Sequence, residues 1–137
     1  MSKQDLKENE QWRTRLSPAA FAVCRQKATE RPFSGALLEE KRRGVFCCAC
    51  CGQPLFASQA KYDSGSGWPS FYDKIKPEAI AECHDTSHGM LRTEVICSAC
   101  DAHLGHLFPD GPHPTGLRYC INSLSLVFEP ANPPEPV

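Results

Sequence analysis

Two C-x-x-C pairs constrain the fold of this chain more than any other feature. Segments 44–55 and 94–104 share one pattern, in which a short apolar stretch leads into the pair, a residue that tolerates a positive φ follows, and a second short apolar stretch leaves it. This pattern is typical of a metal knuckle. Since 45 residues lie between Cys51 and Cys97, a shared metal would clamp distant parts of the chain together.

The four thiolates of the two pairs would close a tetrahedral zinc site with no open position. The first pair can be chosen in two registers. We choose the one in which Gly52 follows the second ligand, as Asp101 does in the second pair, because both residues tolerate the left-handed conformation. The predicted zinc ligands are Cys48, Cys51, Cys97 and Cys100, and the rejected register uses Cys47 and Cys50. A redox-active C-x-x-C pair is the alternative, but it does not need a second copy.

The length of 137 residues predicts a single domain over 1–137. Twelve prolines and nine glycines indicate a loop-rich, mainly β architecture rather than a helical bundle. We expect an N-terminal helical segment over about 3–30, a zinc-stabilised β core over 44–128, and a disordered tail over 129–137. Within the helical segment, Ser17 is the predicted N-cap of a helix that has Pro18 at its first position.

Charge and hydropathy argue against several classes of partner. With 15 basic and 16 acidic residues, the chain has no single-sign field that would recruit nucleic acid or an anionic membrane. No apolar run approaches the roughly 20 residues of a membrane span, and the N-terminus lacks the apolar core of a signal peptide. We therefore expect a cytoplasmic protein. In a reducing compartment, nine cysteines, an odd number, favour metal binding and redox chemistry over disulfides.

Segment 116–128 places one cysteine outside any C-x-x-C pair. The segment is strand-like, and its residues 124–128 alternate apolar with polar or β-branched residues. If the strand begins as early as Leu117, then Arg118, Cys120 and Asn122 share one face. A thiol beside a permanent cation is a candidate for a pKa below the usual value of about 8.5. The alternative is an ordinary buried cysteine.

Four motifs, taken in order, point to a known family. They are DSGSGWPSF at 63–71, HLGHLF at 103–108, DGP at 110–112 and RYCINS at 118–123. Together with both C-x-x-C pairs, this set resembles the methionine-R-sulfoxide reductases (MsrB) from about Phe21 to Phe128. The resemblance implies a mainly β fold of two antiparallel sheets, a small zinc-stabilised β-sandwich or barrel-like domain. It also implies reduction of the R diastereomer of methionine sulfoxide, free or in proteins, with thioredoxin as reductant and protein repair as the role.

The match to the family's RYCIN motif makes Cys120 the nucleophile, whose attack on the sulfoxide sulfur leaves a sulfenic acid. Arg118 would favour the thiolate. Asn122 would hydrogen-bond the substrate or orient a neighbour.

His103 and His106 are the candidates for a proton donor or for positioning water, since histidine changes charge near neutral pH. Metal ligation and burial in the core are the alternatives, and four thiolates already saturate the metal. Three residues apart on a strand, the two rings would face opposite ways. Gly105 between them permits a bend that would bring both inward.

Trp68 is the predicted wall for the S-methyl group, because a Gly-rich loop and Pro69 hold it as a flat apolar surface. An ordinary core tryptophan is the alternative. Phe108 is assigned to the pocket wall or the core, and Phe71 to the core.

One departure from the family concerns recycling. Where many relatives carry a resolving cysteine in the Gly-rich loop, this chain has Ser66, which cannot form a disulfide. Our hypothesis is that Cys24, flanked by Arg25 and Lys27, resolves the sulfenic acid after delivery by a mobile N-terminal segment. A small-molecule reductant, direct attack by thioredoxin, and the other free cysteines remain alternatives. Those cysteines are Cys83, Cys47 and Cys50.

Two other classes of function compete with the reductase. A zinc-stabilised binding module would explain the C-x-x-C pairs but would not need the face of Arg118, Cys120 and Asn122. A nucleic-acid-binding zinc ribbon would need a basic patch, which the balanced charge opposes. A monomer is the default expectation.

Overall fold

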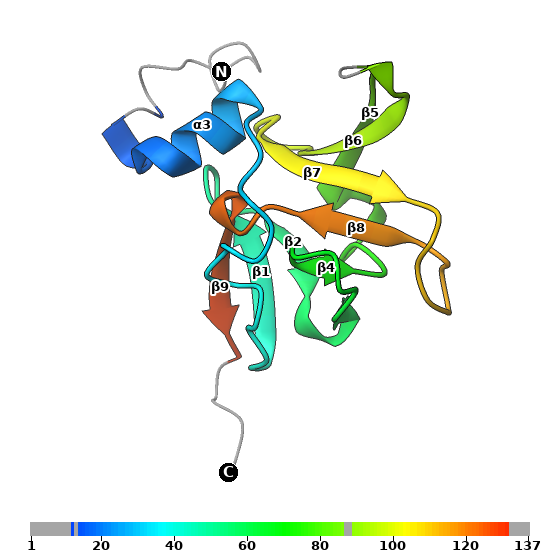
Figure 1. Cartoon of the computed structure of the whole chain (residues 1–137). Helices are drawn as coiled ribbons and strands as arrows, with labels where there is room; N and C mark the ends of the chain where they lie inside the picture. Colours follow the sequence, from blue (N-terminus) through cyan, green and yellow to red (C-terminus); the bar gives the residue numbers. More distant parts are fainter. Residues whose placement is uncertain (1–11, 13, 87–88, 132–137) are drawn as a thin grey trace.

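The computed structural model describes residues 12, 14–86 and 89–131. Within these ranges the helix α3 (Pro18–Gln26) precedes nine strands, so the predicted mainly β fold is confirmed (Figure 1). The outer parts of the predicted helical segment and tail, at 1–11 and 132–137, lie outside the described residues.

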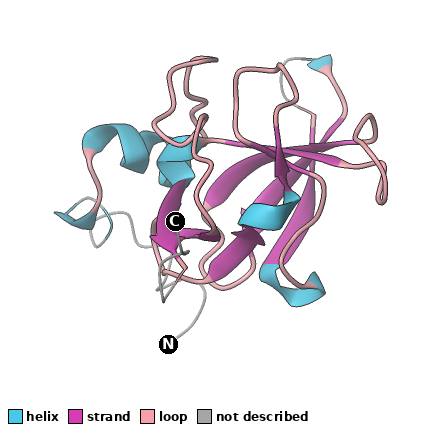
Figure 2. Cartoon of the chain, turned by 90° about the horizontal axis from the view of Figure 1, so that it is seen from below, coloured by secondary structure: helices cyan, strands magenta, loops and turns pink. Residues whose placement is uncertain are grey.

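The strands form two antiparallel sheets, as the family resemblance implied. The smaller sheet has the order β2-β1-β9, and its strands are β1 (Gly44–Cys48), β2 (Pro54–Ala57) and β9 (Leu126–Pro130). The larger sheet has the order β3-β4-β8-β7-β6-β5. Its strands are β3 (Lys61–Tyr62), β4 (Ser70–Phe71), β5 (Ile80–Asp85), β6 (Arg92–Cys97), β7 (His103–Phe108) and β8 (Arg118–Ile121). Figure 2 shows the strands gathered centrally, with the helical segments around them.

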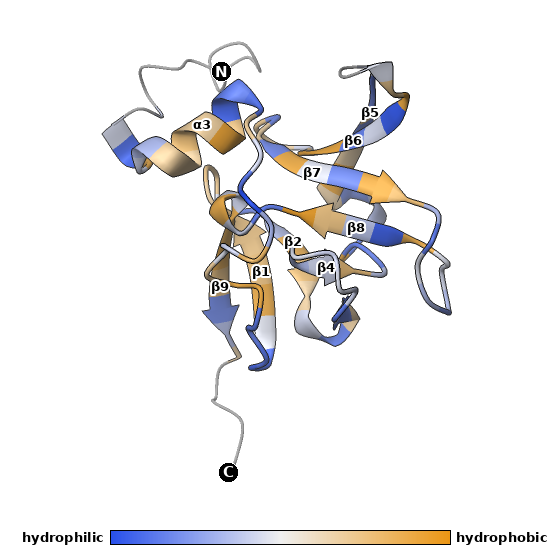
Figure 3. Cartoon of the chain, in the orientation of Figure 1, coloured by the Kyte–Doolittle hydropathy of each residue, from blue (hydrophilic) through white to orange (hydrophobic). Residues whose placement is uncertain are grey.

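An aromatic core joins the two sheets. Phe46 and Phe56 belong to the smaller sheet, whereas Phe71 and Tyr119 belong to the larger one, and all four are fully buried. The rings of Phe56 and Phe71 stack with centroids 4.3 Å apart, and Phe46 meets Phe71 edge-on at 5.1 Å. Each such ring contributes about 1.5–3 kcal/mol by leaving water. The prediction that Phe71 belongs to the core is confirmed. Figure 3 shows the apolar character of β1 and the hydrophilic end of β9.

Helix α3 begins as predicted. Ser17 is its N-cap, and the Ser17 hydroxyl accepts a hydrogen bond from the Ala20 amide at 3.1 Å, while Pro18 fills the first turn. The helix buries a face that includes Phe21 against β7 and the 3-10 turn η4 (Ser123–Ser125). It ends where Lys27 adopts a left-handed φ of 60°. Among the described residues, no helix has the length and apolar character needed to cross a bilayer.

The segment 118–128 differs from the expected strand pattern. Strand β8 ends at Ile121, and η4 carries the chain across to β9 in the smaller sheet. The predicted alternating strand over 124–128 therefore begins only at Leu126. The Asn122 carbonyl accepts the Ser125 amide at 3.0 Å, and the Ser125 hydroxyl donates to the His103 carbonyl at 2.8 Å. These bonds stabilise a turn that alternation alone does not reveal.

Candidate metal centre and candidate active site

Four cysteine thiols converge between the two sheets. They belong to Cys48, Cys51, Cys97 and Cys100, and their sulfur atoms all lie within 4.8 Å of one another. Two of the Sγ–Sγ distances, Cys48 to Cys100 and Cys51 to Cys97, are 3.6 Å. A tetrahedral ion with metal–sulfur bonds of about 2.3 Å would place its ligands about 3.8 Å apart. The residues therefore fit a bound metal ion. Among the described residues, this cluster takes the chosen register and leaves out Cys47 and Cys50.

The two turns that supply these thiols have the same geometry. After β1, the Gly52 amide donates to the Cys48 carbonyl at 2.9 Å, and after β6 the Asp101 amide donates to the Cys97 carbonyl at 2.8 Å. Gly52 has a φ of 83° and Asp101 a φ of 63°, so both predicted left-handed positions are confirmed. The sequence repeat thus corresponds to one structural unit used twice.

Side chains outside the cluster hold the two turns in place. The Gln53 amide nitrogen donates to the Ala79 carbonyl at 2.9 Å and lies 3.5 Å from the Cys97 sulfur. From α3, Arg25 donates to the Cys100 carbonyl at 2.8 Å. Such contacts orient the ligands of a metal site.

A second site, separate from the thiol cluster, surrounds Cys120 on β8. Its pocket has a volume of about 300 Å³. The sequence-predicted residues that line it are Trp68, His106, Phe108, Arg118, Cys120 and Asn122. Other lining residues are Thr29, Ser66, Arg92 and Gly105. The structure thus brings together every predicted substrate and catalytic residue except His103 and Cys24.

The Cys120 thiol is half-buried, and this burial raises its pKa above the ordinary value. The Ser66 hydroxyl, 3.7 Å from the sulfur, and the Arg118 guanidinium act in the opposite direction but do not outweigh burial. The expectation of a lowered pKa was therefore wrong for the free protein. Arg118 makes a two-point ion pair with Asp110 at 2.8 and 3.2 Å and lies over the Phe108 ring, so its charge is shared.

His106 stands directly across from Cys120 in the pairing of β7 with β8. Directly opposite side chains share a face of the sheet. The His106 Nε2 lies 2.7 Å from the Asp85 carboxylate, which also binds Arg92 at 3.2 Å. Burial lowers the pKa of His106, although the bond to Asp85 opposes the shift. Asp85 and Arg92 were missed by sequence reasoning, because no local motif marks a contact that reaches from β5 across β6.

His103 occupies a different environment. Its Nδ1 lies 2.7 Å from the Glu94 carboxylate, and both side chains are buried. It lines a neighbouring cavity rather than the Cys120 pocket. The rings of His103 and His106 are nevertheless only 5.6 Å apart. A register shift produces this proximity, since Val95 pairs with Gly105 but the next residue pairs with His103.

Gly105 is required at this bulge by the approach of the next strand. A Cβ at this position would lie 2.0 Å from the carbonyl oxygen of Cys120. The glycine therefore lets β7 pass close to the backbone of the candidate nucleophile.

The segment after α3 fixes Trp68 and Asn122 relative to each other. The Trp68 indole N–H donates to the Glu30 carbonyl at 3.0 Å, and the Glu30 amide donates to the Asn122 side-chain oxygen at 3.0 Å. The Asn122 amide nitrogen donates to the Leu104 carbonyl at 3.0 Å. Asn122 thus orients its neighbours, one of its two predicted roles. Glu30 was not predicted, since only the folded chain brings it here.

Cys24 lies outside the Cys120 pocket. Its side chain is 2% exposed and its sulfur is 3.8 Å from the Leu124 carbonyl oxygen. It lines the same cavity as His103 and the exposed Cys83. The main influence on its pKa is a hydrogen bond with Cys50, which lowers it together with the Arg25 charge. A direct bond from Cys24 to Cys120 would require α3 to move.

Comparisons with known proteins agree with this geometry. Residues 16–130 match the SelR domain. A protein of Pseudomonas entomophila (strain L48) is 64% identical over 121 residues, covering 88% of this chain and 92% of that protein. A protein of Saccharophagus degradans (strain 2-40) is 57% identical over 129 residues, covering 94% and 96%. Both are named peptide methionine sulfoxide reductase MsrB. Matched over most of its length to this domain and to these relatives, the chain belongs to the MsrB family of peptide methionine sulfoxide reductases.

Proposed function

We propose that this protein reduces the R diastereomer of methionine sulfoxide, in proteins or free, to methionine, and so contributes to the repair of oxidised proteins. One observation carries the proposal: Cys120 lies in a pocket that also contains aromatic side chains, two arginines and a histidine. The names of the relatives support the substrate. The family resemblance supports the choice of diastereomer.

The first step is attack of the Cys120 sulfur on the sulfoxide sulfur. The oxygen passes to Cys120, which becomes a sulfenic acid, and the substrate leaves as the thioether methionine. The cysteine sulfur is oxidised by two electrons, and the sulfoxide sulfur is reduced by two. Trp68 and Phe108 form an apolar wall for the S-methyl group, and Arg92 and Arg118 favour the developing negative charge on oxygen.

His106 moves the proton in this step. Its lowered pKa keeps the imidazole neutral near pH 7, and the contact with the Asp85 carboxylate at 2.7 Å assigns the hydrogen to Nε2. Nδ1 is then an acceptor. The raised pKa of Cys120 leaves the thiol protonated in the free protein, so this proton passes to His106 on attack and then to the sulfoxide oxygen. His103, whose Nδ1 is bonded to Glu94, packs edge-on against the His106 ring and helps to hold it in place.

Recycling of Cys120 uses a second thiol. Cys24 attacks the sulfenic acid, a disulfide forms and water leaves; a dithiol of the thioredoxin class then reduces this disulfide and is itself oxidised. The bond requires α3 to move, because Cys24 lines another cavity. Ser66 next to Cys120 supports the need for a thiol from elsewhere.

The four-thiol cluster holds one structural zinc ion. Its ligands, Cys48, Cys51, Cys97 and Cys100, leave no open position, so the ion supplies stability rather than chemistry. The whole chain, residues 1–137, acts as one domain and as a monomer.

The test of the main reaction uses a racemic mixture of the two sulfoxide diastereomers with excess dithiothreitol, each followed by chiral chromatography. We expect loss of the R form alone, and no loss with Cys120→Ser. Cys83→Ser is the matched control and retains full activity. A folded, zinc-loaded protein that consumes neither form would overturn the proposal.

The test of recycling compares two reductants on Cys24→Ser. Turnover driven by thioredoxin should fall at least tenfold, whereas turnover driven by dithiothreitol should stay within twofold of wild type, since the small dithiol reaches Cys120 directly. Undiminished turnover with thioredoxin would remove Cys24 from the mechanism.

A further inference from the structure

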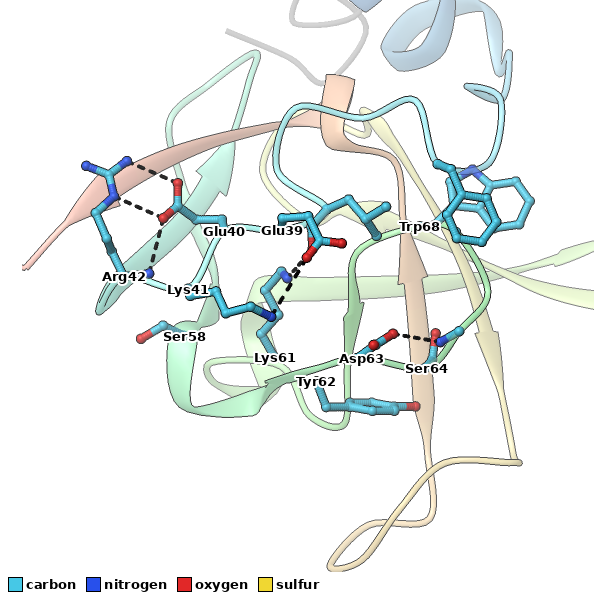
Figure 4. A pocket seen from close by; sticks show the side chains of 14 residues that line it. Glu39, Glu40, Lys41, Arg42, Ser58, Lys61, Tyr62, Asp63, Ser64 and Trp68 are labelled. Carbon is cyan, nitrogen blue, oxygen red and sulfur yellow. Dashed lines mark hydrogen bonds and ion pairs between the residues drawn. The ribbon is translucent and has the colours of Figure 1, made fainter.

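A cavity of about 440 Å³ borders the Gly-rich loop 63–68, and Cys120 is not among the residues that line it. Figure 4 shows the side chains that line it, with Trp68 at one end and the pair of Glu40 and Arg42 at the other. They come from the segment 38–42, from β3 and from the loop 63–68, together with Phe33 and Ser58. None of these residues except Trp68 has a part in the proposed reaction.

Trp68 connects this cavity to the candidate active site, because it lines both. In an extended chain, successive side chains point to opposite sides and successive residues are about 3.3–3.6 Å apart. A polypeptide that crosses the indole can therefore place one side chain in each cavity. Free methionine sulfoxide would fill only the pocket of Cys120.

Phe33 gives the second cavity an exposed aromatic surface. Its side chain is 70% exposed, and it lies against the loop, since a Cβ at Gly67 would be 3.0 Å from its ring. Its φ of 65° is in the left-handed region, which a bulky residue rarely adopts, and its amide donates to the Gly67 carbonyl at 2.7 Å. Strained residues cluster at binding sites, and a large apolar ring in water gains free energy when a ligand covers it.

The charged residues of this cavity favour neither an anionic nor a cationic ligand. The cations Lys41, Arg42 and Lys61 face the anions Glu39, Glu40 and Asp63. Arg42 pairs with Glu40 at 3.0 Å, and Lys61 donates to the Leu38 carbonyl at 2.7 Å. The case for an apolar occupant therefore rests on the aromatic rings of Phe33 and Trp68, which both line this cavity.

We propose that this cavity is a second subsite, which binds an apolar side chain next to methionine sulfoxide in a polypeptide substrate. The proposal rests on the proposed reductase activity and concerns the residue next to methionine sulfoxide in a polypeptide substrate. Phe33 is its specificity-determining residue.

The test uses blocked tripeptides with methionine sulfoxide in the centre, flanked by two phenylalanines or by two glycines, with dithiothreitol as reductant. For wild type we expect a KM about tenfold lower for the phenylalanine peptide, which corresponds to about 1.4 kcal/mol. Phe33→Asn should bring the two KM values within twofold and leave kcat unchanged, because asparagine tolerates the left-handed conformation while the ring is lost. Phe33→Tyr, which keeps an aromatic ring, should retain the preference of the wild type for the phenylalanine peptide.

Val127→Thr is the control, because Val127 is an exposed apolar residue on β9, away from this cavity. It should keep the tenfold preference. Kinetics with free methionine sulfoxide should be the same in all variants. Equal KM values in wild type, or a preference that survives Phe33→Asn, would overturn the subsite alone. Failure to reduce even free sulfoxide would overturn the proposed reaction and the subsite with it.

Discussion

Burial and charge act in opposite directions on the Cys120 thiol. The sulfur lies in a half-buried pocket, which disfavours the thiolate, while Arg118 and Ser66 favour it. Arg118 shares its charge with Asp110 and with the face of Phe108, so burial dominates. In the proposed reaction, a protonated Cys120 thiol would carry the proton that the sulfoxide oxygen needs.

The pH dependence of alkylation follows from this raised pKa. Only the thiolate reacts with iodoacetamide, so the rate at Cys120 should rise with pH and level off above its pKa, with a midpoint above the usual thiol value of about 8.5. Arg118→Met and Ser66→Ala remove groups that lower the pKa, so each should move the midpoint higher. Mass spectrometry of the Cys120 peptide measures the rate, with the exposed Cys83 as an internal reference for the reagent. A midpoint below 8.5 would contradict the burial argument.

At this scale, sequence reasoning succeeded where periodicity or a motif places the residue. Arg118, Cys120 and Asn122 follow a period of two and do line one pocket. Asp85 and Glu30 act through partners 21 and 92 positions away, His106 and Asn122. Contacts of that range depend on the order of strands and on the path of a loop, which no local pattern encodes.

Among the elements, the two turns that carry the C-x-x-C pairs are the most local and were the easiest to predict. Each needs a strand, two thiols and a left-handed residue within a few positions, and Gly52 and Asp101 meet the last condition. The bulge in β7 was harder. Gly105 signalled that a bend was possible, but only the pairing with β6 and β8 decides where it falls and which histidine enters the pocket.

The left-handed conformation of Gly52, in the turn after β1, can be tested without disturbing side-chain packing. A Cβ at Gly52 would meet nothing within 4 Å, so Gly52→Ala costs only the strain of a left-handed φ of 83°. We expect a loss of about 1–2 kcal/mol in the free energy of unfolding, measured by urea titration of the zinc-loaded protein. Gly52→Asn, which tolerates this conformation, should lose less. Equal stability of Gly52→Ala and wild type would show that the turn relaxes.

Across the whole molecule, two features hold the sheets together. One is the buried aromatic core, and the other is the thiol cluster, which joins the end of β1 in the smaller sheet to the end of β6 in the larger one. Hydrophobic burial in a chain of 137 residues leaves a modest margin of stability. The metal is therefore expected to supply much of that margin.

Metal removal tests this expectation. Structural zinc binds with about 10–16 kcal/mol in zinc-finger peptides, and that free energy is coupled to folding. A strong chelator, or Cys48→Ser, should lower the melting temperature by more than 15 °C and abolish zinc in elemental analysis. Cys83→Ser, which removes an exposed cysteine outside the cluster, should change neither. A metal-free protein with the melting temperature of the wild type would contradict a structural role for the ion.

The distance along the chain between the two pairs of thiols has an engineering consequence. If the chain were opened between β5 and β6, each fragment would keep two of the four thiolates, Cys48 and Cys51 on one and Cys97 and Cys100 on the other. The pieces would then depend on zinc to find each other. Such a split protein would convert the concentration of free zinc into an enzymatic signal, with Cys120 on the second fragment and Trp68 on the first.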